Sequence, residues 1–320
     1  MYDEFDLLAR LRRHLDADGP GLPLGVGDDA AVLDVAGRVV AAVDTVVDGV
    51  HVDRRWSTPQ DLGFKALAVN VSDLAAVGAL PLAALVSLQL PSDIDLDEVE
   101  GIYRGLREAA DRWGCQLIGG DTVTSPTLAV SVTVLGRLHD EEVVLRRDGA
   151  QVADLVVVVG GLGLAAAGLE LLRREASRLL DEHPELGAAH RRPVALVEAV
   201  PAMVLAGVSA AIDVSDGLGR DLGHLASDSG VGIRLDPDRL PLAAGVVAAA
   251  THLGIEPHDL VLAGGEDQAL AMTLPPARLG RLDLGLETVG LRARVVGEVV
   301  EGAGVLFDGR DVSASGWVHG

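Results

Sequence analysis

The chain has 320 residues, of which 49% are hydrophobic and only 2% aromatic, and its formal net charge is −22. This length suggests about two domains, and the apolar content excludes an intrinsically disordered chain. The 48 acidic residues outnumber the 26 basic ones, and no basic patch stands out, so a nucleic-acid backbone would be repelled. An anionic substrate is compatible with such a chain only where cations neutralise the carboxylates that meet it.

The single cysteine, Cys115, excludes an internal disulfide and is typical of a reducing compartment. We expect it to be a small buried apolar residue. The first twenty residues predict a short amphipathic helix without the layout of a signal peptide. No apolar run approaches the ~18 residues of a membrane span. The sequence therefore predicts a soluble, cytoplasmic protein.

Short valine-rich runs alternate with stretches rich in alanine and leucine along the whole chain. Strands are expected at Val39–Val43, Ala83–Leu90, Leu117–Ile118, Leu128–Leu135, Leu155–Val159 and Val295–Val300. Helices are expected at 59–78, 95–113, 163–180, 194–207 and 217–229. This alternation predicts an α/β (α+β) protein whose strands are covered by helices.

Two polar stretches interrupt this pattern. Residues 137–151 are turn-rich and predict a domain boundary, with domains at 1–140 and 141–320. Residues 181–193 predict a second, solvated loop; its histidines, His183 and His190, match no usual metal-site spacing.

Acidic residues recur at strand ends, beside glycines or inside an apolar helix. The motifs are GVGDDAA at 25–31, Asp44 after the first strand, NVSDL at 70–74, GGDT at 119–122, DVSDG at 213–217 (preceded by Ile212) and GGED at 264–267. A single aspartate of this kind can be a solvated or capping residue, and Asp216 can cap the helix that follows it. The six motifs together favour a site for hard divalent cations, which prefer oxygen ligands.

The usual phosphate-binding loops are absent. The only lysine, Lys65, lies in GFKA, so the sequence has no Walker A motif, and the protein-kinase motifs are missing as well. Gly160–Gly163 has incomplete spacing for a dinucleotide loop, and a tight strand-to-helix turn is the better interpretation. If the protein handles ATP, it does so through metals that bridge phosphates and carboxylates.

Seven motifs in register resemble the thiamine-monophosphate kinase family, of the superfamily that includes aminoimidazole ribonucleotide synthetase and selenophosphate synthetase. They are GVGDDAAVL, VDTVVDGVH, KALAVNVSDLAAVGA, LIGGDT, DVSDG, GGED and the terminal GW-x-H, and they span about residues 5–319. The resemblance implies an N-terminal α/β domain that dimerises and binds ATP and magnesium. It also implies a C-terminal α/β domain that completes the site, with the active-site cleft between the two.

The same resemblance implies roles for individual residues. Asp213 and Asp216 would be the catalytic residues, with Asp216 holding an ion near the transferred phosphate. Magnesium ligands would be Asp29, Asp44, Asp73, Asp121, Asp213 and Asp216. ATP contacts would come from Tyr103, Gly120, Asp121, Arg147 and Ser215. Contacts with thiamine monophosphate would come from His51, Glu266 and Trp317. The reaction implied is direct in-line transfer of the ATP γ-phosphate to thiamine monophosphate, which gives thiamine diphosphate.

The sequence also departs from the family pattern. Ala42 and Val43 replace hydroxyl residues before Asp44, Leu164 replaces a serine in the turn after the 155–159 strand, and Gln268–Ala269 replace Tyr-Glu after GGED. These changes spare the metal carboxylates and affect substrate contacts. They keep two alternatives open: an enzyme of the same fold with another substrate, and a non-catalytic nucleotide- or metal-binding paralogue.

Overall fold

The computed structural model describes residues 7, 10–27 and 29–317. Most of the expected N-terminal helix, together with Asp28 and His319, lies outside these residues. The chain divides into two compact units, of which the first comprises residues 1–74 and 79–141 and the second comprises 75–78 and 142–320. Among the described residues, no helix is both long and apolar enough to cross a bilayer.

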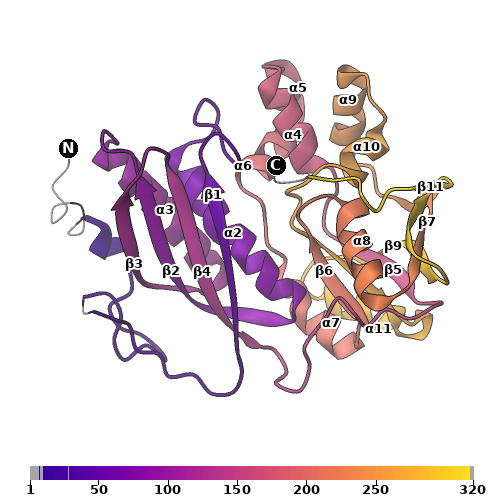
Figure 1. Ribbon diagram of the computed structural model, residues 1–320, viewed down its shortest axis with the longest axis horizontal. Helices are drawn as coiled ribbons and strands as arrows, with labels where there is room; N and C mark the ends of the chain where they lie inside the picture. Colours follow the sequence, from indigo (N-terminus) through magenta and orange to yellow (C-terminus); the bar gives the residue numbers. More distant parts are fainter. Residues whose placement is uncertain (1–6, 8–9, 28, 318–320) are drawn as a thin grey trace. The chain divides into compact units, whose positions relative to one another are not determined.

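The described part of the first unit is built on a four-stranded sheet in the order β1-β4-β2-β3. Its strands are β1 (Val39–Val47), β2 (Ala79–Leu90), β3 (Gln116–Thr124) and β4 (Ala129–Leu138). Two helices, α2 (Pro59–Ala76) and α3 (Leu96–Trp113), lie along one face of the sheet (Figure 1). The strands alternate accordingly: Val86, Leu88 and Leu90 are buried on the helix side, and the residues between them face the other way.

The described part of the second unit contains a seven-stranded mixed sheet in the order β11-β10-β7-β9-β5-β8-β6. Its strands are β5 (Leu155–Val159), β6 (Ala210–Val214), β7 (Gly232–Leu235), β8 (Ala269–Leu274), β9 (Arg294–Val300), β10 (Gly304–Phe307) and β11 (Arg310–Asp311). Its helices are α4 (Leu164–Arg173), α5 (Ser177–Glu182), α6 (Pro184–Arg191), α7 (Val200–Ala206), α8 (Leu218–Ser229), α9 (Ala244–Leu253), α10 (Pro257–Leu262) and α11 (Leu279–Glu287). Short 3-10 helices occur at Arg12–His14, Val197–Ala199, Pro237–Arg239 and Pro276–Arg278.

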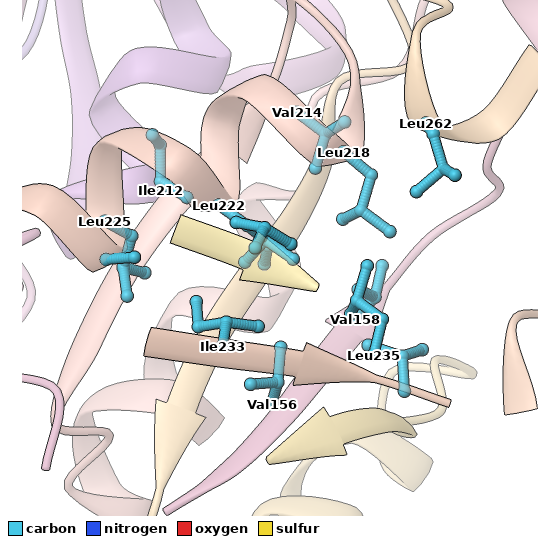
Figure 2. Close-up of a cluster of buried hydrophobic side chains, with 14 of the residues drawn as sticks. Val156, Val158, Ile212, Val214, Leu218, Leu222, Leu225, Ile233, Leu235 and Leu262 are labelled. Carbon is cyan, nitrogen blue, oxygen red and sulfur yellow. The ribbon is translucent and has the colours of Figure 1, made fainter. Parts of the chain in front are cut away.

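Helix α8 is fixed on the second sheet by an apolar stripe. Leu218, Leu222 and Leu225 recur at helical spacing and are 0% exposed. Figure 2 shows them with strand residues such as Ile212 and Ile233 in one buried cluster. Burial of each such side chain contributes about 1.5–3 kcal/mol. The loop between β6 and α8, which carries DVSDG, is therefore held at both ends by the core.

The mixed α/β prediction is confirmed, and each strand range predicted from the sequence overlaps an observed strand. Four local expectations are wrong. Asp44 lies inside β1, which continues to Val47, and GGDT lies inside β3. GGED follows helix α10 rather than a strand. The expected loop at 181–193 is largely helical, because Pro184 at the first position of α6 starts a new helix directly after α5.

Candidate active site

The acidic residues of the first unit occupy a loop, two strands and a helix. Asp29 is exposed in the loop before β1. Asp44 pairs with Val132, whose side chain is buried on the helix side of the sheet, whereas Asp121 pairs with Ser87 on the open side. Because successive residues of a strand point to opposite faces, Asp44 and Asp121 lie on opposite faces of this sheet.

Helix α2 carries Asp73 in its last turns, where the chain is otherwise apolar. Asp73 is half-buried, and Asn70 and Ser72 are fully buried. Asn70 donates from Nδ2 to the Ala66 carbonyl at 2.8 Å, and its Oδ1 is buried with no hydrogen-bond partner among the described residues. Residues three apart share a helix face, so an oxygen acceptor lies beside the Asp73 position.

His51 is held by its own loop and by the only lysine of the chain. Its Nδ1 accepts a hydrogen bond from the Val47 amide at 3.1 Å, and its carbonyl accepts one from Lys65 Nζ at 2.8 Å. Lys65 is only 1% exposed, so this ammonium anchors the His51 loop from inside the unit. With Nδ1 engaged as an acceptor, that nitrogen does not serve as a general base.

Two predicted nucleotide contacts of the first unit have evident roles in packing. Tyr103 on α3 is buried, its ring centroid lies 6.3 Å from that of His14, and burial raises the pKa of its hydroxyl. Gly120 has a φ of 155°, and a Cβ at this position would lie 1.8 Å from the Val86 carbonyl oxygen. Glycine is therefore required at position 120 for β3 to pair with β2, whatever else it contacts.

The DVSDG turn of the second unit is closed by an aspartate that the sequence argument overlooked. Asp221 Oδ2 accepts hydrogen bonds from the amides of Ser215, Asp216 and Gly217 at 3.0–3.2 Å. The pKa of Asp221 is raised to about 7, chiefly by burial, and the carboxylates of Asp213 and Asp216 raise it further. Because its backbone N–H is taken, the hydrogen-bond donor that Ser215 can offer a ligand is its hydroxyl.

Asp213 and Asp216 are the two predicted metal ligands of this turn. Asp213 is only 4% exposed, an unusual setting for an aspartate at the end of a buried strand. Asp216 Oδ2 lies 3.6 Å from Arg220 Nε. The possibility that Asp216 caps α8 is wrong: the N-cap residue is Gly217, no side chain caps it, and Asp221 satisfies the turn amides instead.

Glu266 and Trp317, distant in sequence, both bond to this turn through their backbones. The Glu266 amide donates to the Ser215 carbonyl at 2.7 Å, and the Trp317 amide donates to the Asp216 carbonyl at 2.9 Å. The indole of Trp317 is 47% exposed. The fold of the second unit thus brings Glu266 and Trp317 to adjacent carbonyls of one acidic turn.

The neighbour of Glu266 has a structural role. Asp267 accepts hydrogen bonds from the amides of Gly163 at 2.6 Å and Ala165 at 3.2 Å. Burial raises the pKa of Asp267 to about 7 against the opposing effect of these amides. The interpretation of Gly160–Gly163 as a strand-to-helix turn is confirmed, because it joins β5 to α4. The amides of Gly163 and Ala165, which could have bound a phosphate, donate to the Asp267 carboxylate instead.

Glu266 also contacts a buried histidine. His190 on α6 is 2% exposed, and its Nδ1 lies 2.8 Å from Glu266 Oε2. The expectation that His190 is solvated is therefore wrong: the last turn of α6 packs it inside the unit. The sequence signal was available, since His190 follows an apolar Gly-Ala-Ala run, but only the fold reveals its partner.

Arg147 does not reach the DVSDG turn through its backbone. Its carbonyl accepts a hydrogen bond from Ser229 Oγ at 2.8 Å, and Ser229 ends the helix that begins at Leu218. The length of α8 separates the two places by about 16 Å. Nucleotide binding by the exposed guanidinium of Arg147 stays a prediction.

No group of three or more His, Cys, Asp or Glu side chains is arranged to hold a metal ion within the described part of this chain. A cavity of about 320 Å³ in the first unit is lined by residues including Arg54, Ser57 and Glu98, and by none of the predicted site residues. Arg54 and Glu98 form an ion pair there at 2.6 Å. The expectation for Cys115 is confirmed: it is a free, buried thiol whose pKa burial raises to about 12.

Comparison with known proteins places the chain in a family. Residues 27–138 match the AIR synthase related protein N-terminal domain, and residues 151–308 match the corresponding C-terminal domain. The thiamine-monophosphate kinase of Mycobacterium tuberculosis is 38% identical over 320 residues, which cover 98% of this chain and 90% of that protein.

Solved structures of thiamine-monophosphate kinases are similar to this chain as well. That of the thiamine-monophosphate kinase from Stenotrophomonas maltophilia K279a is 36% identical, covers 96% of this chain and 97% of that one, and has a TM-score of 0.86. A structure of AaThiL complexed with AMPPCP and TMP is 34% identical over 98% of this chain and 96% of that one, with a TM-score of 0.80. The chain belongs to the thiamine-monophosphate kinase family of the AIR synthase related proteins.

Proposed function

We propose that the protein transfers the γ-phosphate of ATP to thiamine monophosphate and so makes thiamine diphosphate. The observation that carries the proposal is the second-unit turn at 213–217, with Glu266 and Trp317 bonded to adjacent carbonyls. Relatives named for this activity align over nearly the full chain, and the AaThiL complex holds AMPPCP, an ATP analogue, together with TMP.

The donor set suits magnesium. Asp29, Asp44, Asp73, Asp121, Asp213 and Asp216 offer hard carboxylate oxygens, which Mg²⁺ prefers together with water and substrate phosphates. The buried Oδ1 of Asn70 beside Asp73, which has no hydrogen-bond partner among the described residues, is a further oxygen ligand, and the carboxylates of Asp213 and Asp216 raise the pKa of Asp221. Bound at these residues, Mg²⁺ would neutralise the polyphosphate and the charge that develops on the leaving ADP.

The acceptor needs no general base. A phosphate monoester has a second pKa near ~6, so thiamine monophosphate arrives ionised near neutral pH. The protein must hold two anions in line and exclude competing geometries. His51 fits this requirement. Its Nδ1 already accepts a hydrogen bond from the Val47 amide, so the imidazole ring can orient a ligand but does not remove a proton through this nitrogen.

The proposed substrate contacts come from residues whose backbone amides are held by hydrogen bonds. The Ser215 hydroxyl would contact ATP, since its amide is held by Asp221. Trp317 offers an exposed aromatic face and Glu266 a carboxylate, a combination that suits a cationic thiazolium and is worth roughly 0.5–2 kcal/mol through the cation–π contact. Tyr103, Gly120, Asp121 and Arg147 remain proposed nucleotide contacts.

The departures at Ala42, Val43, Leu164, Gln268 and Ala269 motivate two other functions: another substrate for the same fold, or nucleotide binding without turnover. Gln268 is 3% exposed and its amide bonds to the Val214 carbonyl, so this change lies in the loop interior and not on its ligand-facing side. We expect ATP-dependent turnover of thiamine monophosphate in preference to thiamine or unrelated phosphate monoesters. Preference for another acceptor, or ATP binding without turnover, would select one of the alternatives.

We also propose a homodimer formed through the first unit. Val39, Val43, Leu85 and Val123 all lie on the sheet face that the helices do not cover, and they are 38–64% exposed. An apolar face of this kind is typical of an isologous interface. Because the reaction consumes ATP and the one cysteine is a free thiol, the cytoplasm is the proposed location.

Light scattering at micromolar concentration is expected to give twice the mass of one chain. The variant Val43→Glu, which puts a charge at the most exposed valine of the apolar face, is expected to give a monomer. Leu284→Glu, at an equally exposed leucine of the second unit, is the matched control and should remain a dimer. A monomeric wild-type chain would refute the interface.

A further inference from the structure

A buried histidine contacts the carboxylate that the proposed function places against the acceptor. His190 belongs to the last turn of α6, and its Nδ1 lies 2.8 Å from Glu266 Oε2 although 76 residues separate the two in sequence. The side chain of His190 is 2% exposed and that of Glu266 is 26% exposed. One end of the pair is therefore fixed in the protein interior, and the other reaches the surface.

The chemistry of the pair defines which atom donates. An ionised carboxylate only accepts hydrogen bonds, so Nδ1 of His190 carries the hydrogen and donates it to Glu266. His190 also lies at the C-terminal end of α6, where the helix dipole favours a donor or a positive charge. The helix thus supports the donor form of the ring at this position.

The backbone of Glu266 is fixed separately from its side chain. Glu266 has a φ of +69°, unusual for a residue other than glycine, and its amide bonds to the Ser215 carbonyl. Two residues later, Gln268 has a φ of +52° and bonds to the Val214 carbonyl. The main chain is therefore anchored to β6, but a glutamate side chain retains three rotatable bonds that these contacts leave unconstrained.

We propose that His190 is a positioning residue, which holds the Glu266 carboxylate in the orientation that binds thiamine monophosphate. This rests on the proposed role of Glu266 in acceptor binding. His190 acts through Glu266, with its Nδ1 on one carboxylate oxygen, so that the exposed part of the carboxylate faces the acceptor. Acceptor affinity depends on the histidine, and ATP affinity does not.

The test compares the KM values for the two substrates in variants at position 190. His190→Leu removes the donor and is expected to raise the KM for thiamine monophosphate about tenfold to a hundredfold, the range for a lost hydrogen bond to a charged group. The KM for ATP should change less than about twofold. His190→Asn is expected to recover most of the loss, because its Nδ2 branches from Cγ as Nδ1 does.

The matched control is His183→Leu. His183 precedes α6 and pairs with Glu185 of the same helix at 3.3 Å, so the variant removes the same kind of contact from the same segment and should leave both KM values unchanged. Should His190→Leu not fold, His190→Phe keeps a ring without the donor and carries the same comparison.

A double-mutant cycle separates positioning from general packing. Glu266→Gly removes the carboxylate without strain, because glycine adopts the positive φ at this position freely. In the Glu266→Gly background, His190→Leu should change the KM for thiamine monophosphate less than about twofold. Additive effects, or equal rises in both KM values, would overturn the proposal and mark His190 as a packing residue.

The outcomes also separate this proposal from the proposed function. Normal wild-type turnover with an unchanged KM in His190→Leu would overturn the positioning role alone. An unchanged KM in Glu266→Gly would remove both the acceptor role of Glu266 and the positioning role, with the kinase activity intact. Absence of turnover by the wild-type protein would overturn the proposed function and this proposal with it.

Discussion

Replacing Asp213 with asparagine is expected to lower turnover at least about a hundredfold, the scale of a lost electrostatic contribution to the transition state. The side chain is 4% exposed at the end of β6 and lies among the carboxylates that raise the pKa of Asp221. Asparagine keeps the shape of the side chain and removes one negative charge from this group. The folded state should tolerate the change, because the repulsion between neighbouring carboxylates decreases.

Initial rates at saturating ATP and thiamine monophosphate, together with a thermal melt of each variant, measure the two effects separately. Asp228→Asn is the matched control, since Asp228 is an exposed aspartate on the helix that follows the same turn. It should keep near-normal turnover. A loss of fold in Asp213→Asn, or turnover within a few-fold of wild type, would show that Asp213 is a structural residue.

Removal of divalent cations is expected to abolish turnover and excess Mg²⁺ to restore it. The chain carries a net charge of −22, and its predicted ligands are carboxylates that repel both phosphorylated substrates unless cations intervene. The measurement is the initial rate after incubation with EDTA. EDTA already saturated with Mg²⁺ is the control and should leave the rate unchanged. Turnover that survives thorough chelation would refute the metal-centred part of the proposed function.

Periodicity and composition were sufficient to predict the elements that are predominantly apolar. The run Leu155–Val159 is a buried strand as expected, and the alanine- and leucine-rich stretch 59–78 corresponds to α2. Strand ends are predicted less accurately, because an acidic residue such as Asp44 and a glycine pair such as Gly119–Gly120 are typical of positions where a strand stops. Asp44 continues the antiparallel pairing of edge strand β1 with β4. Gly120 continues the parallel pairing of β3 with β2, where the close approach of the Val86 carbonyl requires glycine.

Residues that organise the site were harder to predict because their partners are distant in sequence. Asp221 and Asp267 look like ordinary surface acids, yet each accepts backbone hydrogen bonds that close a turn. Lys65 has no motif of its own, and its burial is explained by the hydrogen bond that its Nζ donates to the His51 carbonyl. His190 looks solvated in the sequence because the polar, proline-containing residues around it are typical of a loop, whereas they form the short helix α6. Each of these residues is defined by a tertiary contact, which periodicity and spacing do not contain.

The motifs were sufficient to predict the family, and the fold gives a physical reason why some of the motifs lie together. Glu266 and Trp317 are 51 positions apart in the numbering, yet both bond to the Ser215–Asp216 carbonyls. By contrast, Asp44 and Asp121 lie on opposite faces of one sheet. Which of the six proposed ligands share an ion is therefore a question that motif order alone does not answer.

The most direct test of the central claim is to incubate the purified protein with thiamine monophosphate, ATP and Mg²⁺ and to separate the products by chromatography. The account predicts thiamine diphosphate and ADP in equal amounts, with the γ-phosphate label of ATP recovered in thiamine diphosphate. It also predicts no ADP beyond background when thiamine monophosphate is left out. ATP that binds and stays intact in the presence of thiamine monophosphate, with no thiamine diphosphate formed, would contradict it.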